Sequence, residues 1–152
     1  MCKIYVCFQI AENGVAKITD VGVANPTDRL SFTLNCSPAY MAPEVLLGTG
    51  NQTNKIDIYS VALIYWEICF GEDTGSVMKR EILGPSFYGD PLASIQKRQM
   101  DPCGGWRPSF NTGNAPPSGL IDLIQAAWSD NADRRPTAKD IRLSIEKLIS
   151  SC

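Results

Sequence analysis

The chain has 152 residues, of which 44% are hydrophobic and 20% are charged, as in an ordinary soluble domain. Its formal net charge is −2 and it contains no run of Lys or Arg, so nothing in it favours binding to nucleic acid or to an anionic membrane. It contains no histidine, which excludes Ser-His-Asp and Cys-His nucleophilic catalysis and any metal site that needs imidazole.

The cysteine pattern indicates free thiols. The six cysteines are widely spaced and form no C-x-x-C pair. Small disulfide-stabilised domains carry denser cysteines, so we expect a reducing compartment. The longest apolar stretch, residues 56–70, is too short to cross a bilayer and contains Asp57 and Glu67. We therefore expect no membrane span within this chain.

A β-hairpin is predicted at residues 4–19. Two short runs of β-forming residues are joined there by Asn13-Gly14, which favours the type I′ turn whose twist suits a hairpin. Residues 25–38 are polar and aperiodic, which predicts a loop. A short helix is expected next, at about residues 42–47.

The clearest helix is predicted at residues 54–70. Asn54 can cap its start, Asp57 lies near the positive end of the helix dipole, and Gly71 ends it. Apolar side chains cover nearly all of its faces: Ile56, Ile58, Val61, Leu63, Ile64, Trp66, Ile68 and Phe70. A helix that is apolar all round is buried on all sides, so we expect this helix to be central.

The rest of the chain is predicted to be a long connection followed by two helices. Residues 71–119 are rich in Gly and Pro, with one helix expected at about residues 90–98. Residues 120–149 hold the two C-terminal helices, the second of which begins with the capping-box pattern of Thr137 and Asp140. The fold class that follows is mainly α with a small β-hairpin.

One acidic residue has the surroundings of a metal ligand. Asp20 comes directly after a predicted strand, and Gly22 allows the chain to turn sharply behind it. A nucleotide-bound Mg²⁺ usually takes only one or two protein carboxylates, so this placement suits magnesium. The same pattern is also typical of an acid that only forms a turn.

Short motifs follow Asp20 in a characteristic order: Tyr40-Met41-Ala42-Pro43-Glu44, then Asp57-Ile58-Tyr59-Ser60, then Trp128, Asp130, Arg135 and Pro136. This series resembles the C-terminal lobe of the eukaryotic protein kinases. It looks closest to the tyrosine-kinase-like group of Ser/Thr kinases and related receptor kinases. The resemblance runs from about Val15 to the end, so residues 1–152 are expected to form a partial kinase domain with a protein-kinase-like C-terminal lobe.

The resemblance implies roles within an activation segment at residues 20–44. Asp20 matches the magnesium-binding Asp of D-F-G, so Mg²⁺ and ATP are the cofactors that the family implies. Ser37 matches a position where Ser/Thr kinases usually carry a substrate-facing threonine, which favours Ser/Thr over Tyr as the acceptor. The candidate phosphorylation sites, each of which also reads as an ordinary solvated hydroxyl, are Thr27, Ser31, Thr33 and Ser37.

The resemblance also implies structural residues. Ala42-Pro43-Glu44 matches A-P-E, and Glu44 is expected to form a partly buried ion pair with Arg135; the alternative is two unrelated surface charges. Asp57 matches a helix-start carboxylate that accepts hydrogen bonds from the H-R-D segment of the family. Because that segment is missing here, we expect Asp57 to be buried with too few donors, and its pKa to be raised by desolvation.

The chain departs from the family pattern at its start. Counting back from Asp20, H-R-D-x-x-x-x-N should end at Cys7 with its Asp at Cys2, but residues 1–7 match none of this motif. The Gly-rich phosphate loop, the Lys of V-A-I-K and its Glu partner have no match either, and Val21 replaces the Phe of D-F-G. We therefore expect no intact catalytic residue, weak ATP binding and no phosphorylation by this chain alone.

Three readings follow from the sequence. The first is a protein Ser/Thr kinase whose N-terminal half is missing from this sequence or lies in another chain. Such a kinase is expected in the cytoplasm or in the cytoplasmic part of a longer receptor-type kinase. The second is a pseudokinase-like module that docks protein partners. The third is a truncated product with little function. A protein substrate or signalling partner is the implied partner of the first two.

Overall fold

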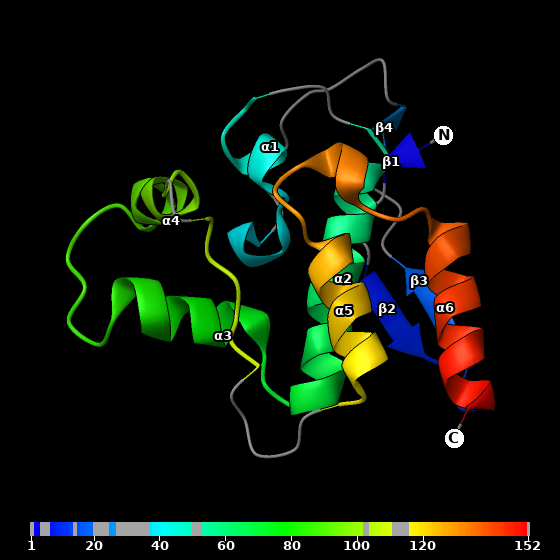
Figure 1. Ribbon diagram of the computed structural model, residues 1–152. Helices are drawn as coiled ribbons and strands as arrows, with labels where there is room; N and C mark the ends of the chain where they lie inside the picture. Colours follow the sequence, from blue (N-terminus) through cyan, green and yellow to red (C-terminus); the bar gives the residue numbers. More distant parts are fainter. Residues whose placement is uncertain are drawn as a thin grey trace.

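The chain folds around one central helix, with the other helices on its sides and the strands near the N-terminus (Figure 1). The structure, a computed structural model, describes residues 2–3, 7–13, 15–19, 25–26, 37–49, 53–101, 104–110 and 116–151. The fold class expected from the sequence, mainly α with a small β-hairpin, is confirmed.

The predicted hairpin is present but shorter than residues 4–19. Strand β2 (Cys7–Ile10) pairs antiparallel with β3 (Ala16–Thr19), with Cys7 opposite Thr19. The turn is closed by the Ala11 amide, which donates to the Val15 carbonyl at 2.9 Å. A second pair, β1 (Cys2–Lys3) with β4 (Asn25–Pro26), was not predicted. The expected loop at residues 25–38 therefore begins with two residues of strand.

The central helix is α2 (Lys55–Phe70). Its end is as predicted: Gly71 adopts a left-handed φ of 67° and donates its amide to the Glu67 carbonyl. Its start differs, because the Asn54 side chain makes no capping hydrogen bond and Thr53 Oγ1 accepts from the Lys55 amide at 3.3 Å instead. The prediction that α2 is buried on all sides is wrong, since Ile68 is 74% exposed.

Short elements on either side of α2 complete one half of the domain. The 3-10 turn η2 (Pro38–Tyr40) leads into α1 (Pro43–Leu46). After α2, helix α3 (Thr74–Met78) continues into the π-helical turn η3 (Lys79–Leu83). Neither α3 nor η3 was predicted from the sequence. Helix α4 (Pro91–Gln99) follows, close to the predicted range of 90–98, with Asp90 Oδ1 accepting from the Leu92 amide at 2.9 Å.

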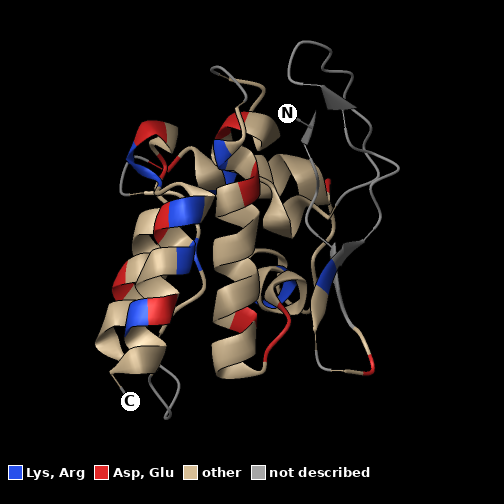
Figure 2. Cartoon of the chain, turned by 90° about the vertical axis from the view of Figure 1, so that its right-hand side faces the viewer, with Lys and Arg blue, Asp and Glu red and all other residues tan. Residues whose placement is uncertain are grey.

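The second half consists of α5 (Ser118–Ala127), the 3-10 turn η4 (Ala132–Arg134) and α6 (Ala138–Ser150). Helices α5 and α6 approach closely at Gly119, where a Cβ atom would lie 2.8 Å from Leu148 Cδ2. Charged residues are dense on α6, whereas α2 carries none between Asp57 and Glu67 (Figure 2). Within the described residues, no helix is long and apolar enough to cross a membrane.

The core is built on aromatic side chains that join α2 to α5 through the connection before α5. Ring centroids are 5.1 Å apart for Trp66 and Phe70, 5.9 Å for Phe70 and Phe110, and 5.2 Å for Phe110 and Trp128. Trp66 Nε1 donates to the Ser109 carbonyl at 3.0 Å. Residues 104–110 are therefore packed against the core, although their Gly and Pro content suggested only a loose connection.

The capping box at the start of α6 gives a test of this half of the fold. Thr137 Oγ1 accepts from the Asp140 amide, and the Asp140 carboxylate accepts from the amide and hydroxyl of Thr137. These hydrogen bonds lower the pKa of Asp140. Thr137→Ala should reduce the free energy of unfolding by about 1 kcal/mol, as is typical for a lost N-cap.

Because the pKa of Asp140 is lower in the folded state, its stabilisation is present above the unfolded pKa of about 3.9 and is lost as pH falls. The difference between wild type and Asp140→Asn in urea unfolding should therefore be clear at neutral pH and shrink under acid conditions. Gln125→Ala, at an exposed position within α5, is the control. A difference that does not change with pH would contradict the assignment.

Candidate functional site

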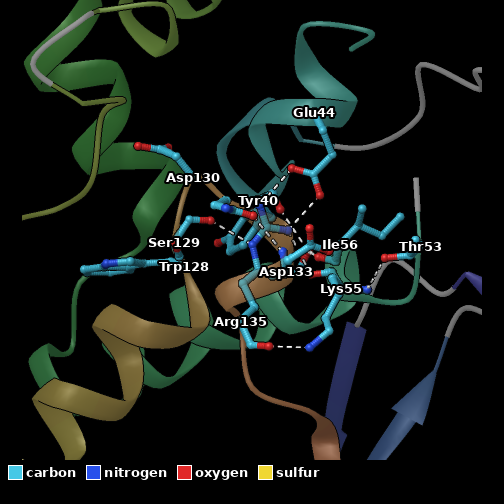
Figure 3. Close-up of polar contacts among 12 residues, drawn as sticks. Tyr40, Glu44, Thr53, Lys55, Ile56, Trp128, Ser129, Asp130, Asp133 and Arg135 are labelled. Atoms are coloured by element: carbon cyan, nitrogen blue, oxygen red, sulfur yellow. Dashed lines mark hydrogen bonds and ion pairs between the residues drawn. The ribbon is translucent and has the colours of Figure 1, made fainter. Parts of the chain in front are cut away.

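A buried guanidinium joins the A-P-E segment to the helical core (Figure 3). Arg135 is 1% exposed. Its Nη1 and Nη2 donate to the two carboxylate oxygens of Glu44 at 2.7 and 2.8 Å, in a bidentate ion pair. The ion pair predicted from the sequence is therefore present, and 91 residues separate its partners along the chain. Bidentate Arg–carboxylate pairs fix geometry as well as adding binding energy.

The other donors of Arg135 bind two further parts of the chain. Its Nε donates to the Ser129 carbonyl at 2.8 Å, and Nη1 also donates to the Lys55 carbonyl at 3.0 Å. In return, Lys55 Nζ donates to the Arg135 carbonyl. One side chain thus ties together α1, the first residue of α2 and the turn after α5.

A second arginine, which was not predicted from the sequence, reinforces this junction. Arg107 Nη2 donates to Asp130 Oδ1 at 2.6 Å and to the Trp128 carbonyl at 2.7 Å. The centroid of the buried Tyr59 ring lies 4.8 Å from Arg107 Cζ and 5.2 Å from Arg135 Cζ, within the range of cation–π attraction. Burial raises the pKa of Tyr59 although both guanidinium groups oppose this. The available signal for Arg107 was its place among aromatic residues within a Gly- and Pro-rich stretch.

A cluster of Tyr40, Glu67 and Asp73, here called the tyrosine clamp, holds the chain just before the A-P-E segment. Tyr40 Oη lies 2.5 Å from Glu67 Oε1 and 3.1 Å from Asp73 Oδ2, so two carboxylates share its single hydroxyl proton. Burial and the hydrogen bond to Glu67 raise the pKa of Tyr40 strongly. The Thr74 amide donates to Glu67 Oε1 at 2.6 Å, and Ser60 Oγ donates to the Tyr40 carbonyl at 2.9 Å. Residues 38–40 are thereby fixed against both α2 and α3.

The hydrogen bonds of Asp73 explain why it stays ionised beside Glu67. Its Oδ1 accepts from the Ser76 amide at 2.7 Å and caps α3. Hydrogen bonds to Ser76 lower the pKa of Asp73, and the Tyr40 hydroxyl adds to this effect. The clamp therefore consists of two carboxylates held together by donors from two elements, η2 and α3.

The structure places some predicted site residues and not others. Ala42 and Pro43 are buried at the start of α1, and they bring Glu44 to Arg135. Ser37 is exposed at the start of η2, and its Oγ lies 3.9 Å from where a Cβ on Gly75 would be. The other predicted loop and metal residues lie outside the described residues: Asp20, Thr27, Ser31 and Thr33. Of Cys2, only the backbone is described.

Asp57 differs from its prediction. It is half-buried rather than buried, and it is not without a partner. The expectation of a buried carboxylate is therefore wrong: Asn54 is exposed and Lys55 is half-buried, so this side of the start of α2 is incompletely covered. Among the described residues, no cluster of three or more Cys, Asp or Glu could hold a metal ion.

Comparison with known proteins identifies the family of the chain. The protein kinase domain family matches residues 8–144. A dual serine/threonine and tyrosine protein kinase of Bos taurus is 39% identical over 121 residues, 80% of this chain and 12% of the relative. The corresponding kinase of Pimephales promelas is 28% identical over 138 residues, 88% of this chain and 13% of the relative.

A third relative is named for serine and threonine alone, without tyrosine. A probable serine/threonine-protein kinase of Dictyostelium discoideum is 30% identical over 135 residues, 87% of this chain and 7% of the relative. Across these three proteins, the chain spans between 7% and 13% of the length of the relative that it matches.

The buried ion pair generates a test of the junction. Removing one partner of such a pair leaves a buried charge without compensation and costs about 3–5 kcal/mol. Arg135→Ala should therefore lower the free energy of unfolding by that amount, measured by urea denaturation. Arg134→Ala, at the exposed neighbouring position, is the matched control and should change little. Similar losses of stability for the two variants would show that Arg135 does not hold the A-P-E segment to the helical core.

The tyrosine clamp gives a separate test. Tyr40→Phe removes the proton that Glu67 and Asp73 share, and the loss of a hydrogen bond to a charged group should cost about 1.5–3 kcal/mol at pH 7. Because the pKa of Tyr40 is raised on folding, the wild-type advantage should be complete below about pH 10, the unfolded value, and fall as pH rises above it. Tyr65→Phe, on the other side of α2, should change stability less. Equal effects at both positions would argue against the clamp.

Proposed function

Since the chain belongs to the protein kinase domain family, we propose that it supplies the C-terminal, substrate-facing lobe of a protein kinase that phosphorylates Ser or Thr. The observation that carries this proposal is the bidentate pair of Glu44 and Arg135. Through Arg135, this ion pair holds the A-P-E segment against the start of α2. A lobe that positions a protein substrate requires this segment to be held in place. Protein substrates are the partners that this role implies.

The preference for Ser/Thr rests on one position. Ser37 is exposed directly before the clamped residues 38–40, so its hydroxyl can meet a substrate while the chain behind it is held in place. The relatives include kinases named for Ser/Thr and kinases named for dual specificity. We therefore propose Ser/Thr as the acceptor, with Tyr as the alternative to be measured.

Residues 1–152 by themselves are proposed to be inactive. Phosphoryl transfer is catalysed mainly by positioning and by charge stabilisation, which needs a glycine-rich cover, a lysine on the phosphates, two metal ligands and a base. Among these, only Asp20 has a match, and Cys2 falls at the position expected for the base. A single carboxylate binds Mg²⁺ weakly because the ion gives up its water reluctantly. If bound, Mg²⁺ would neutralise charge on the ATP phosphates beside Asp20.

The same mismatch favours a second candidate, a pseudokinase-like module. A lobe in which Cys2 stands at the base position can keep its protein-binding surfaces without transferring phosphate. Under either candidate, we propose that the domain works in the cytoplasm or in the cytoplasmic part of a longer receptor-type kinase. The two candidates differ in whether activity can be restored.

The first test uses the purified chain. It should show no shift in melting temperature with Mg·ATP and should not transfer radioactive phosphate to a generic protein substrate. Labelling that disappears in Asp20→Ala would contradict the proposal, because it would show a working site built from other residues.

A fusion then separates the two candidates. Joining a kinase N-terminal lobe with an intact catalytic loop upstream of residue 8 should restore nucleotide binding in a manner that depends on Asp20. Phosphorylation of Ser or Thr by this fusion would support the kinase reading. Restored nucleotide binding without phosphate transfer would support the pseudokinase reading. A fusion that showed neither nucleotide binding nor phosphate transfer would contradict the placement of Asp20.

A further inference from the structure

Ser37 and Pro38 form the only Ser-Pro or Thr-Pro pair in the sequence. Ser37 is exposed and its backbone is extended, with φ −63° and ψ 123°, the conformation that a proline imposes on the residue before it. Pro38 has no amide N–H, so an enzyme that acts on Ser37 must not need a hydrogen bond from the following residue. These are the features of an acceptor for a proline-directed Ser/Thr kinase.

The carboxylates of the tyrosine clamp lie beside this serine. Asp73 Oδ1 and Ser37 Oγ lie 3.3 and 3.9 Å from the point that a Cβ atom on Gly75 would occupy, so both oxygens approach the same spot on α3. Asp73 Oδ2 and Glu67 Oε1 both lie within hydrogen-bonding distance of Tyr40 Oη, at 3.1 and 2.5 Å. A group attached to Ser37 Oγ is therefore next to two carboxylates.

The clamp holds these carboxylates without a positive charge. Within the part of the chain that the structure describes, neither Glu67 nor Asp73 forms an ion pair with Lys or Arg. Two amides at the start of α3 are already used, since Thr74 N–H donates to Glu67 Oε1 at 2.6 Å and Ser76 N–H donates to Asp73 Oδ1 at 2.7 Å. These groups offer a further anion neither an unpaired cation nor an unused amide.

We propose that a proline-directed Ser/Thr kinase phosphorylates Ser37 and that the phosphate releases the tyrosine clamp. In the reaction, Ser37 Oγ forms a bond to the γ-phosphorus of ATP, the bond from that phosphorus to the bridging oxygen breaks, and ADP leaves. The hydroxyl proton passes to a base of the modifying kinase. At pH 7 the new group carries a charge of about −1.5 to −2.

The surroundings decide the effect of this charge. A phosphate orders a segment when it meets an arginine cluster, and it disrupts a segment when it lies next to Asp or Glu. Ser37 belongs to the second case, because repulsion pushes it away from Asp73. Residues 38–40 then lose their attachment to α3, whereas the ion pair of Glu44 and Arg135 still holds α1 to the core. The result is a local opening and not a loss of the whole fold.

The opening would disturb the surface proposed for the substrate, and only this consequence rests on the proposed function. The modification itself needs no activity of this chain, because another kinase supplies it. The proposal can therefore fail while the proposed function stands, and it applies equally to a pseudokinase-like module.

The first experiment tests the acceptor. The purified chain is treated with a mitogen-activated protein kinase, which is a proline-directed enzyme, and with radioactive Mg·ATP. Incorporation of phosphate should fall at least about tenfold both in Ser37→Ala and in Pro38→Ala, because specificity rests on this pair. A sample without the added kinase measures any transfer by the chain itself. Labelling that persists in Ser37→Ala, or a wild-type chain that is not labelled, would overturn the proposal.

The second experiment tests the release of the clamp by hydrogen exchange, on the chain with phosphoserine inserted at Ser37 during translation. The amides of Tyr40 and Met41 donate to the carbonyls of Ser37 and Pro38, each at 3.2 Å. Their exchange should be at least about tenfold faster than in the unmodified chain, because repulsion raises the population of the open clamp. The amide of the buried Ile124 in α5 should exchange as before.

Two controls make this result specific. Asp73→Asn removes one negative charge, so in this variant phosphorylation should change the exchange rate of the Tyr40 amide by a clearly smaller factor. Phosphoserine at Ser86, which is exposed in the loop between η3 and α4, should leave that rate unchanged. Slower exchange after phosphorylation of Ser37, an equal factor in Asp73→Asn, or an equal effect from Ser86 would each contradict the release of the clamp by charge.

Discussion

The burial of one positive charge organises the domain. Arg135 has 1% of its surface exposed, and an unpaired charge at that depth would be strongly destabilising. Its acceptors are Glu44, the Lys55 carbonyl and the Ser129 carbonyl, which belong to distant parts of the sequence. The charge is therefore compensated only when α1, the start of α2 and the turn after α5 are all in place. This requirement couples the A-P-E segment to the packing of the whole helical core.

How far the sequence predicts these features depends on how local the determining contacts are. The β2–β3 hairpin, the end of α2 at Gly71 and the cap at Thr137 depend on neighbours a few residues away, and the structure has them. Glu44 and Arg135 are far apart, but the kinase resemblance supplied their pairing. Arg107 and the Tyr40 clamp depend on partners 21 to 33 residues away and have no comparable motif, so they were not predicted.

The two errors on α2 both concern burial, although one came from periodicity and the other from the kinase resemblance. Periodicity shows that a helix has apolar residues on every face, but not which neighbouring elements cover each face. Ile68 was expected to be covered and is exposed, whereas Asp57 was expected to be buried and is half-buried. Burial is a property of the assembled domain, and the elements that surround α2 differ along its length. The sequence of a single helix therefore predicts its average burial better than the burial of each residue.

The geometry of α2 also separates the tyrosine clamp from an apolar groove, which Tyr65, Ile68 and Cys69 line together with residues of α5 and α6. At about 100° per residue, Tyr65 and Cys69 each lie about 160° from Glu67 around the helix. Glu67 holds the Tyr40 clamp, whereas Tyr65 and Cys69 line the apolar groove. The clamp and the groove are thus on opposite faces of one helix. Ser37 precedes the residues that are clamped on the Glu67 face, so the exposed Ser37 lies on the clamp side of α2 and away from the groove. The same helix therefore separates the apolar groove from the surface proposed for the substrate.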